Sequence, residues 1–130
     1  MVTLKSSYQR RRERINRDGS PFFRVSFGII AAGAFQQVVP DSDIPASAKY
    51  KPLDFVEITN NASENLELEI NNNADERIPV PAGVIRIIDR RPIWNIRIVN
   101  TALTATSAGE VVALFQRLPI DADEAARREG

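Results

Sequence analysis

The sequence predicts an all-β fold: an antiparallel β-sandwich, jelly-roll or Ig-like in type, with an extended N-terminal arm. Three observations favour this class. Apolar and polar residues alternate over much of residues 21–118, as they do in strands with one buried face. Turn signals separate these runs at spacings of about 10 residues. Helical patterns are confined to the polar ends of the chain. The length of 130 residues allows one domain with short extensions.

The clearest strand is Leu66–Ile70, in which leucine and isoleucine alternate with Glu67 and Glu69. The glutamates are expected on the solvent face, where they favour solubility. The same alternation predicts further strands with these pairs on the buried face: Val56 and Ile58, Ile85 and Ile87, and Ile96 and Ile98. Phe22–Ile30 is rich in aromatic and β-branched residues and predicts the first strand. Val111–Phe115 is apolar on both faces, which indicates a central strand or an interface.

Between the strands, clusters of asparagine, proline and glycine predict turns. Residues 40–52 contain three prolines and few apolar side chains, so we expect a long surface loop there or an excursion across a neighbouring subunit. Trp94 is the one tryptophan. By alternation it shares a face with Ile96 and Ile98, which predicts that it is buried. The alternative role for Trp94 is a carbohydrate-binding platform, for which a single exposed ring without aromatic partners is weak evidence.

The distribution of charge divides the chain into three parts: a basic arm over residues 1–20, a β-sandwich domain over 21–118 and a polar tail over 119–130. The arm has six basic and two acidic side chains, and the rest of the chain carries the balancing negative charge. Ser7–Asn16 and Asp121–Glu129 have the composition of short polar helices, without an apolar stripe wide enough to dock firmly. Because the arm is strongly basic, we expect it to contact something negatively charged.

Composition removes several kinds of chemistry. The chain has no cysteine and no histidine, so it lacks the commonest nucleophile–base pairs and the commonest zinc ligands. Asp41-Ser42-Asp43 and Asn71–Glu76 are rich in oxygen donors but lack the spacing of a calcium loop, and they are interpreted as turns. We therefore predict no catalytic residue, no metal site and no cofactor. The uncharged stretch Val25–Phe35 is too short to span a bilayer, so no membrane partner is expected.

The candidate partner-contact residues are all arginines, because a guanidinium pairs bidentately with carboxylates. They are Arg10, Arg11, Arg12, Arg14, Arg17, Arg90 and Arg91. Alternatives stay open for both groups. The arm is interpreted in one of three ways: as a solvated terminus, as a segment that contacts another protein chain, or as a segment that contacts nucleic acid. A second group flanks an expected turn before Pro92 and consists of Arg86, Asp89, Arg90 and Arg91. This group is interpreted either as a surface ion-pair cluster or as a clamp between subunits.

The run from Asp54 to Arg117 has a recurring texture: a strand ending in asparagine, a turn of the type Ile-Pro-Ala-Gly, a strand, a polar corner and a second strand ending in asparagine. The segments that carry it are Phe55–Asn61, Leu66–Asn71, Ile78–Val84, Asp89–Ile93, Ile96–Asn100 and Gly109–Val112. This texture resembles the small β-sandwich structural proteins of tailed-phage and related virus particles. It covers about half of the chain and includes no catalytic residue.

The resemblance implies a non-enzymatic virion structural protein: a head decoration protein, a minor capsid protein, or a neck or tail component. Its expected place is the virion, assembled in the host cytoplasm. Its expected partners are copies of itself, joined through the arm and loops into a homo-oligomer, and other virion proteins. Two alternatives from other classes remain. One is a nucleic-acid-binding module that uses the basic arm, and the other is a carbohydrate- or receptor-binding sandwich.

Overall fold

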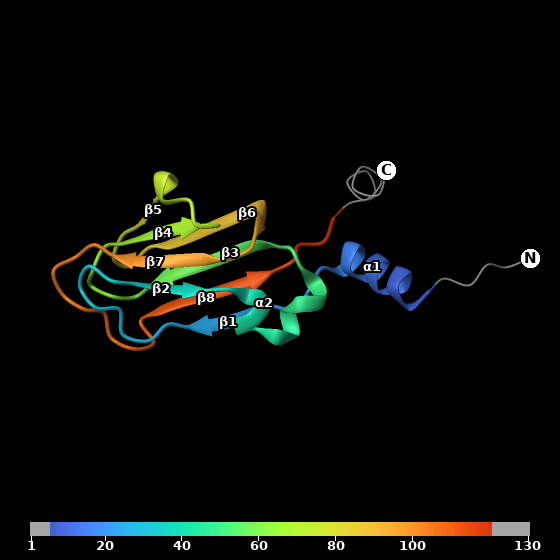
Figure 1. Ribbon diagram of the computed structural model, residues 1–130, viewed down its shortest axis with the longest axis horizontal. Helices are drawn as coiled ribbons and strands as arrows, with labels where there is room; N and C mark the ends of the chain where they lie inside the picture. The colour runs from blue at the N-terminus through green and yellow to red at the C-terminus, as the bar shows by residue number, and fades with distance from the viewer. Residues whose placement is uncertain (1–5, 121–130) are drawn as a thin grey trace, which may run out of the picture.

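The computed structural model of the chain describes residues 6–120, which form two four-stranded antiparallel sheets packed face to face (Figure 1). Sheet A has the order β1 (Phe23–Ser26), β8 (Val111–Gln116), β3 (Leu53–Asn60) and β6 (Ile85–Ile93). Sheet B has the order β2 (Phe35–Val38), β7 (Ile96–Asn100), β4 (Leu66–Ile70) and β5 (Ile78–Val80). The predicted all-β antiparallel sandwich is confirmed. β8 is the central strand that its two apolar faces indicated.

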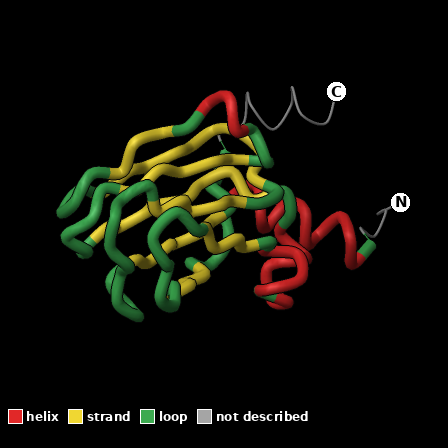
Figure 2. Tube along the Cα trace, turned by 60° about the vertical axis from the view of Figure 1, so that its left-hand side comes forward, coloured by secondary structure: helices red, strands yellow, loops and turns green. Residues whose placement is uncertain are grey.

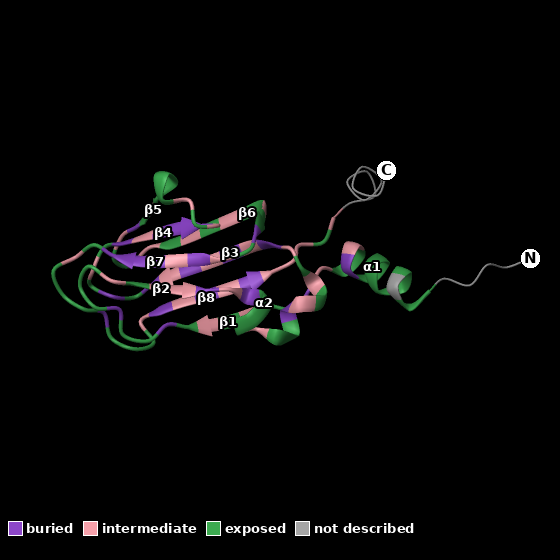
Figure 3. Cartoon of the chain, viewed as in Figure 1, coloured by how far each residue is buried: buried purple, intermediate pink, exposed green. Residues whose placement is uncertain are grey.

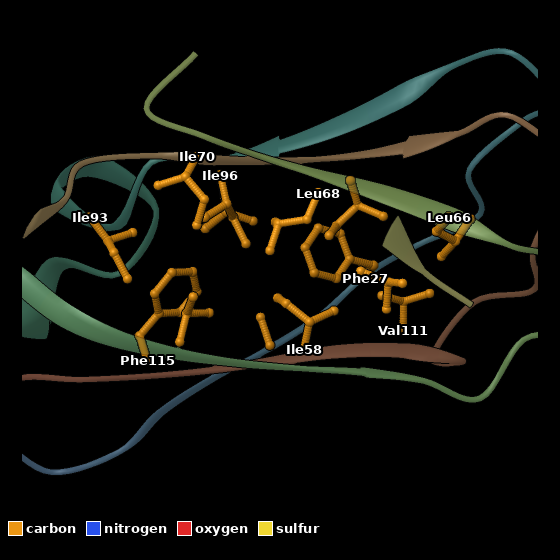
Figure 4. Packing of buried hydrophobic residues seen from close by; sticks show 14 of the residues in the cluster. Phe27, Ile58, Leu66, Leu68, Ile70, Ile93, Ile96, Val111 and Phe115 are labelled. Atoms are coloured by element: carbon orange, nitrogen blue, oxygen red, sulfur yellow. The ribbon is translucent and has the colours of Figure 1, made fainter. Parts of the chain in front are cut away.

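Large apolar side chains fill the space between the sheets (Figure 4). The predicted inward residues of β3, β4 and β7 are buried, and Phe27 and Phe115 add the largest side chains. Each fully buried side chain of this size stabilises the fold by about 1.5–3 kcal/mol. Alternation therefore predicted seven of the sixteen residues in this core cluster. The inward residues are Val56, Ile58, Leu66, Leu68, Ile70, Ile96 and Ile98.

β6 alternates as expected, but the face that was predicted to be buried is the exposed one. Ile85 and Ile87 point outward and are 55% and 57% exposed, so the prediction that they are buried is wrong. Arg86 takes the inner side, opposite the core residue Ile58 of β3. Because β6 lies at the edge of sheet A, Arg86 can reach across the gap between the sheets, and its Nε donates to the Pro79 carbonyl at 2.8 Å.

The predicted turn before Pro92 is also wrong, because β6 continues to Ile93. The true turn is at Trp94, which is 51% exposed, so its predicted burial is wrong. Strand alternation stops at Ile93, which is buried in place of Trp94. Asn71 holds the turn in place. Its Oδ1 accepts from the amides of Trp94 at 2.7 Å and Asn95 at 3.3 Å.

The helices gather mainly at one end of the sandwich (Figure 2). They are α1 (Ser7–Asp18), α2 (Pro40–Asp43) and the 3₁₀ helix η1 (Pro45–Tyr50), and a further short 3₁₀ helix, η2 (Ala74–Glu76), connects β4 to β5. The long surface loop expected over residues 40–52 is thus wrong. Pro40 and Pro45 each begin a helix, a position where the missing amide costs nothing. The buried Ser47 hydroxyl lies 2.7 Å from the Ile44 carbonyl and 3.0 Å from that of Pro40.

The described part of the basic arm is α1 rather than an extended chain. Ser6 and Gln9 form a capping box, in which each side chain accepts a hydrogen bond from the other residue's amide. Glutamine, arginine and glutamate are good helix formers, so the local sequence favours the helix once it is capped. The predicted short helix over Ser7–Asn16 is confirmed and continues to Asp18. Asp121–Glu129, the other predicted helix, lies outside the described residues.

Two loops at the opposite end of the sandwich are built in the same way around buried asparagines. Asn60 ends β3, and its Nδ2 donates to the carbonyls of Glu64 and Val80, both at 2.9 Å. Its Oδ1 accepts from the Ala62 amide at 2.9 Å. Asn100 ends β7 and repeats the arrangement. It donates to the carbonyls of Ile30 at 3.0 Å and Thr104 at 2.8 Å and accepts from the Ala102 amide at 3.0 Å. Each asparagine therefore closes a loop and fastens it to a second segment.

A hydrogen bond joins these two loops and supports a prediction for pH. The Thr104 hydroxyl donates to Glu64 Oε1 at 2.9 Å, and this bond lowers the pKa of the Glu64 carboxyl. Thr104→Val removes the donor, so we expect the pKa of Glu64 to rise toward its ordinary value in a carboxyl NMR titration. Because the folded-state pKa is lowered, the stabilisation is present above the unfolded-state pKa and is lost as the pH falls through the folded-state value. An unchanged Glu64 pKa would contradict this.

The outer face of sheet B is covered by charged side chains that pair with each other. Arg77 bonds Glu69 at 3.0 Å and Glu67 at 3.2 Å. Glu69 is only 3% exposed, so its expected role as a solvent-facing, solubility-promoting residue is wrong. The Arg97 guanidinium lies 4.7 Å from the centre of the Phe35 ring and bonds Gln37 at 3.2 Å. These contacts pair charged and polar side chains across this face, where the ring of Phe35 is still 54% exposed.

Candidate partner-binding site: the cationic end

The end of the sandwich that carries α1 has a cleft between that helix and η1. Its cavity volume is about 490 Å³. The floor includes the apolar side chains of Ile15, Ala48 and Pro52. Five of the described lining residues are cations and none is acidic, so the cleft concentrates positive potential and attracts anions. The cations are Arg11, Arg12, Lys49, Lys51 and Arg117.

A second cleft of about 300 Å³ adjoins the first, because Pro52 and Arg117 line both. It contains Arg90 and Arg91, with Asp54 as its one acidic residue among the described lining. The two clefts together are here called the cationic end.

Arg90 and Arg91 reach the second cleft through a bulge in β6. Residues 90–92 lie between the pairs Phe55–Asp89 and Leu53–Ile93, where β3 has only Asp54. Extra residues of this kind bend a strand and redirect its side chains. Arg90 accordingly adopts a φ of 59°, in the left-handed region.

Arg117 connects the two clefts and is held in place by its neighbours. Its Nη1 donates to the carbonyls of Tyr50 at 3.4 Å and Pro52 at 3.3 Å. Its Nε lies 4.0 Å from the Asp54 carboxylate, which also accepts from the Leu118 amide at 2.7 Å. A guanidinium positioned by protein groups in this way loses little entropy when it binds an anion.

The C-terminal half of α1 docks on the chain that follows β8. Ile15 is buried, and the Asn16 carbonyl accepts from the Ile120 amide at 2.8 Å. Gly19 ends the helix with a φ of 75°, and a Cβ there would lie 2.7 Å from the Arg117 carbonyl oxygen. The N-terminal half is exposed and extends away from the sheets (Figure 3). The helix is thus anchored at one end and presents its arginines to solvent at the other.

The structure brings four of the seven predicted contact residues to the two clefts: Arg11, Arg12, Arg90 and Arg91. Arg10 and Arg14 line a shallower hollow on the helix, together with Ser7 and Arg11. Arg17 lines neither of the two clefts nor this hollow. Its Nε bonds Asp18 Oδ1 at 2.8 Å, a contact that raises the pKa of Arg17 and lowers that of Asp18.

Sequence reasoning missed three cations of the cationic end: Lys49, Lys51 and Arg117. Lys49 and Lys51 lie in and just after the short helix η1, in the segment that was interpreted as a loop. Arg117 directly follows β8, and its carbonyl accepts from the Ser20 amide at 2.8 Å. The prolines around the two lysines were interpreted as the sign of a surface loop, so no signal in the sequence indicated that these cations gather.

No protein-family model and no curated protein matches the chain. Within residues 6–120, no three acidic side chains lie close enough together to hold a metal ion. The helices of the same residues are all too short or too polar to cross a bilayer. Trp94, although exposed, is not among the residues that line the two clefts.

Proposed function

We propose that the protein is a non-enzymatic structural component of a virus particle, attached through its cationic end to an acidic surface of a neighbouring protein subunit. The observation that carries the attachment is the gathering of basic side chains from four separate segments at one end of the sandwich. They come from α1, from η1 and Lys51, from the bulge of β6 and from Arg117. Basic side chains that lie close together repel each other, and an acidic surface of a partner offsets this repulsion because the two potentials are complementary.

The strand order supports the jelly-roll type for this sandwich. Strands pair as β1 with β8, β2 with β7, β3 with β6 and β4 with β5. Further pairs, β3 with β8 and β4 with β7, join these hairpins into the two sheets. A long hairpin folded over on itself gives this order, which is that of the eight-stranded jelly rolls in viral capsid and lectin domains. Because virion proteins and lectins share this order, the resemblance in residues 54–117 is what favours a virion component over a carbohydrate-binding one.

An acidic protein segment fits the first cleft better than nucleic acid does. None of the described residues that line the two clefts is aromatic, whereas proteins that bind single strands stack the bases on aromatic rings. The apolar floor of Ile15, Ala48 and Pro52 suits aliphatic side chains between carboxylates.

The attachment is tested with two labelled anions of equal charge, a polyglutamate peptide and a single-stranded DNA. We expect the peptide to bind more tightly than the DNA at physiological ionic strength. Arg11→Gln with Arg12→Gln should weaken peptide binding by about tenfold, because two charge-assisted contacts are lost and glutamine preserves the helix. Fluorescence anisotropy measures both affinities.

Arg17→Gln is the matched control, because Arg17 lies on the same helix outside both clefts and should leave the affinity unchanged. Tighter binding of the DNA would favour the nucleic-acid alternative. Equal losses for the cleft pair and for Arg17 would show a diffuse attraction to the helix and would overturn the assigned site.

The place in a particle has its own test. Particles purified by density gradient from cultures that carry the gene are analysed by mass spectrometry. We expect this chain in the particle band in a fixed ratio to the major particle proteins, and its absence from that band would contradict the proposal.

A further inference from the structure

The chain that follows β8 runs beside α1, toward the N-terminal half of that helix. The Arg117 carbonyl accepts from the amide of Ser20, just beyond the helix, at 2.8 Å. Further along the chain, the Ile120 amide donates to the carbonyl of Asn16, inside the helix, also at 2.8 Å. Asn16 is one of the residues that line the first cleft. The described chain therefore ends at the rim of that cleft.

The next turn of α1 in this direction carries Arg12. Residues four apart on a helix lie on the same face, about 6 Å apart along the axis. Arg12 and Asn16 are spaced in this way, and both line the first cleft. An extended chain advances about 3.3–3.6 Å per residue. About two residues that continue the path beyond Ile120 are therefore enough to reach the level of Arg12.

The sequence supplies acidic side chains at this point. Residues 121–124, outside the described part of the chain, are Asp121, Ala122, Asp123 and Glu124, here called the acidic segment. The segment has three carboxylates, whereas the described lining of the first cleft has five cations and no acidic group. The charges of the two are therefore complementary. Because the segment starts at the rim of the cleft, its effective concentration there is of the order of mM.

We propose that the acidic segment binds in the first cleft of its own chain and that a partner must displace it. The inference rests on the proposed function in one respect, namely that this cleft receives the partner's carboxylates. The segment then acts as an internal competitor, and the partner's apparent affinity falls with the fraction of molecules whose cleft is open. Attachment is thereby restricted to partners that bind more strongly than the segment does.

The contact is tested first without any partner, by NMR of the full chain. Asp121→Asn with Asp123→Asn removes two of the three charges and preserves the size of the side chains. We expect the Arg12 Nε–H signal and the Lys49 amide signal to shift, because both residues line the cleft that the segment leaves. Dilution by about tenfold should not change these shifts, since binding within one chain does not depend on concentration.

Asp75→Asn with Glu76→Gln is the matched control. It removes the same charge from the exposed helix η2, which lines neither cleft. The signals of Arg12 and Lys49 should stay in place in this variant.

Polyglutamate binding, measured by fluorescence anisotropy, tests the competition. We expect the Asp121→Asn, Asp123→Asn variant to bind about fivefold more tightly than the unaltered chain. A segment that occupies the cleft for about four-fifths of the time lowers the partner's apparent affinity by this factor. The control variant should gain less than about twofold, because its charges lie outside both clefts and are screened by salt.

The possible outcomes separate the two proposals. Unchanged Arg12 and Lys49 signals in the Asp121→Asn, Asp123→Asn variant would overturn the proposed contact, as would equal gains of affinity in that variant and in the control. Shifts that disappear on dilution would place the segment in the cleft of a second copy and overturn binding within one chain. Shifted signals without polyglutamate binding by any of the chains would support the contact and overturn the proposed attachment.

Discussion

Asn60→Ala is expected to destabilise the protein by about 3 kcal/mol, with a fall in melting temperature of about 10 °C. The Asn60 side chain is fully buried and makes three hydrogen bonds, to the carbonyls of Glu64 and Val80 and to the Ala62 amide. Alanine removes all three and leaves the buried Val80 carbonyl and Ala62 amide without these partners. One of these bonds joins sheet A to sheet B, so the loss affects the packing of the sandwich as well as the loop. Chemical denaturation followed by circular dichroism measures the change.

Two comparisons isolate the hydrogen bonds from other effects. Asn61→Ala changes the neighbouring exposed residue and should cost less than about 0.5 kcal/mol. Asn100→Ala removes the equivalent bonds in the second loop and should cost about as much as Asn60→Ala. A loss below about 1 kcal/mol at Asn60 would show that the buried amide contributes far less than its three bonds indicate.

Gly19→Ala is expected to release α1 from the body of the protein. Gly19 has a φ of 75° and a ψ of −163°, a region that residues with a side chain rarely occupy. The added Cβ would lie 2.7 Å from the Arg117 carbonyl oxygen and 2.9 Å from Pro119 Cδ. Backbone strain and the close contacts together should cost about 3 kcal/mol, and undocking of the helix relieves both. Trypsin should then cleave the arginines of α1 about a hundredfold faster, and the sandwich should stay folded.

Gly33→Ala is the matched control for Gly19→Ala. Gly33 has nearly the same φ, 73°, but a Cβ added there would meet nothing within 4 Å. This variant should show only the backbone cost of about 1 kcal/mol and no faster cleavage of α1. If both variants behaved alike, the contact with Arg117 would not be what fixes the helix.

Alternation predicted the fold class because a half-buried strand has a period of two whatever its neighbours are. It could not predict which face is buried where both faces carry apolar residues. In β6 the apolar residues Ile85, Ile87 and Ile88 lie on both faces, so alternation does not say which face is buried. The face is set by Arg86, whose side chain donates to the Pro79 carbonyl from the inner side of this edge strand. That choice depends on strand order, which short-range patterns do not contain. The same limit explains Trp94, where a turn of two residues interrupted the alternation.

The cationic end was predictable only in part. The sequence showed two groups of basic residues, the arginines of residues 10–17 and the pair Arg90-Arg91. That these two groups lie at the same end of the sandwich depends on a bulge in β6 and on the docking of Ile15. Lys49 and Arg117 join them through tertiary contacts alone. Their positions follow from where η1 and the end of β8 lie in space, and no local pattern encodes that.

Because α1 lies at one end of the sandwich, the two ends of the molecule differ: one is the cationic end and the other consists of loops. The described chain begins in this helix and returns to it at Ile120, while the connections after β1, β3, β5 and β7 lie at the far end (Figure 1). A subunit attached to a particle through its cationic end would place those connections on the outside of the particle. Sequence change there, as at the almost fully exposed Leu103, would alter what the exterior displays without touching the means of attachment.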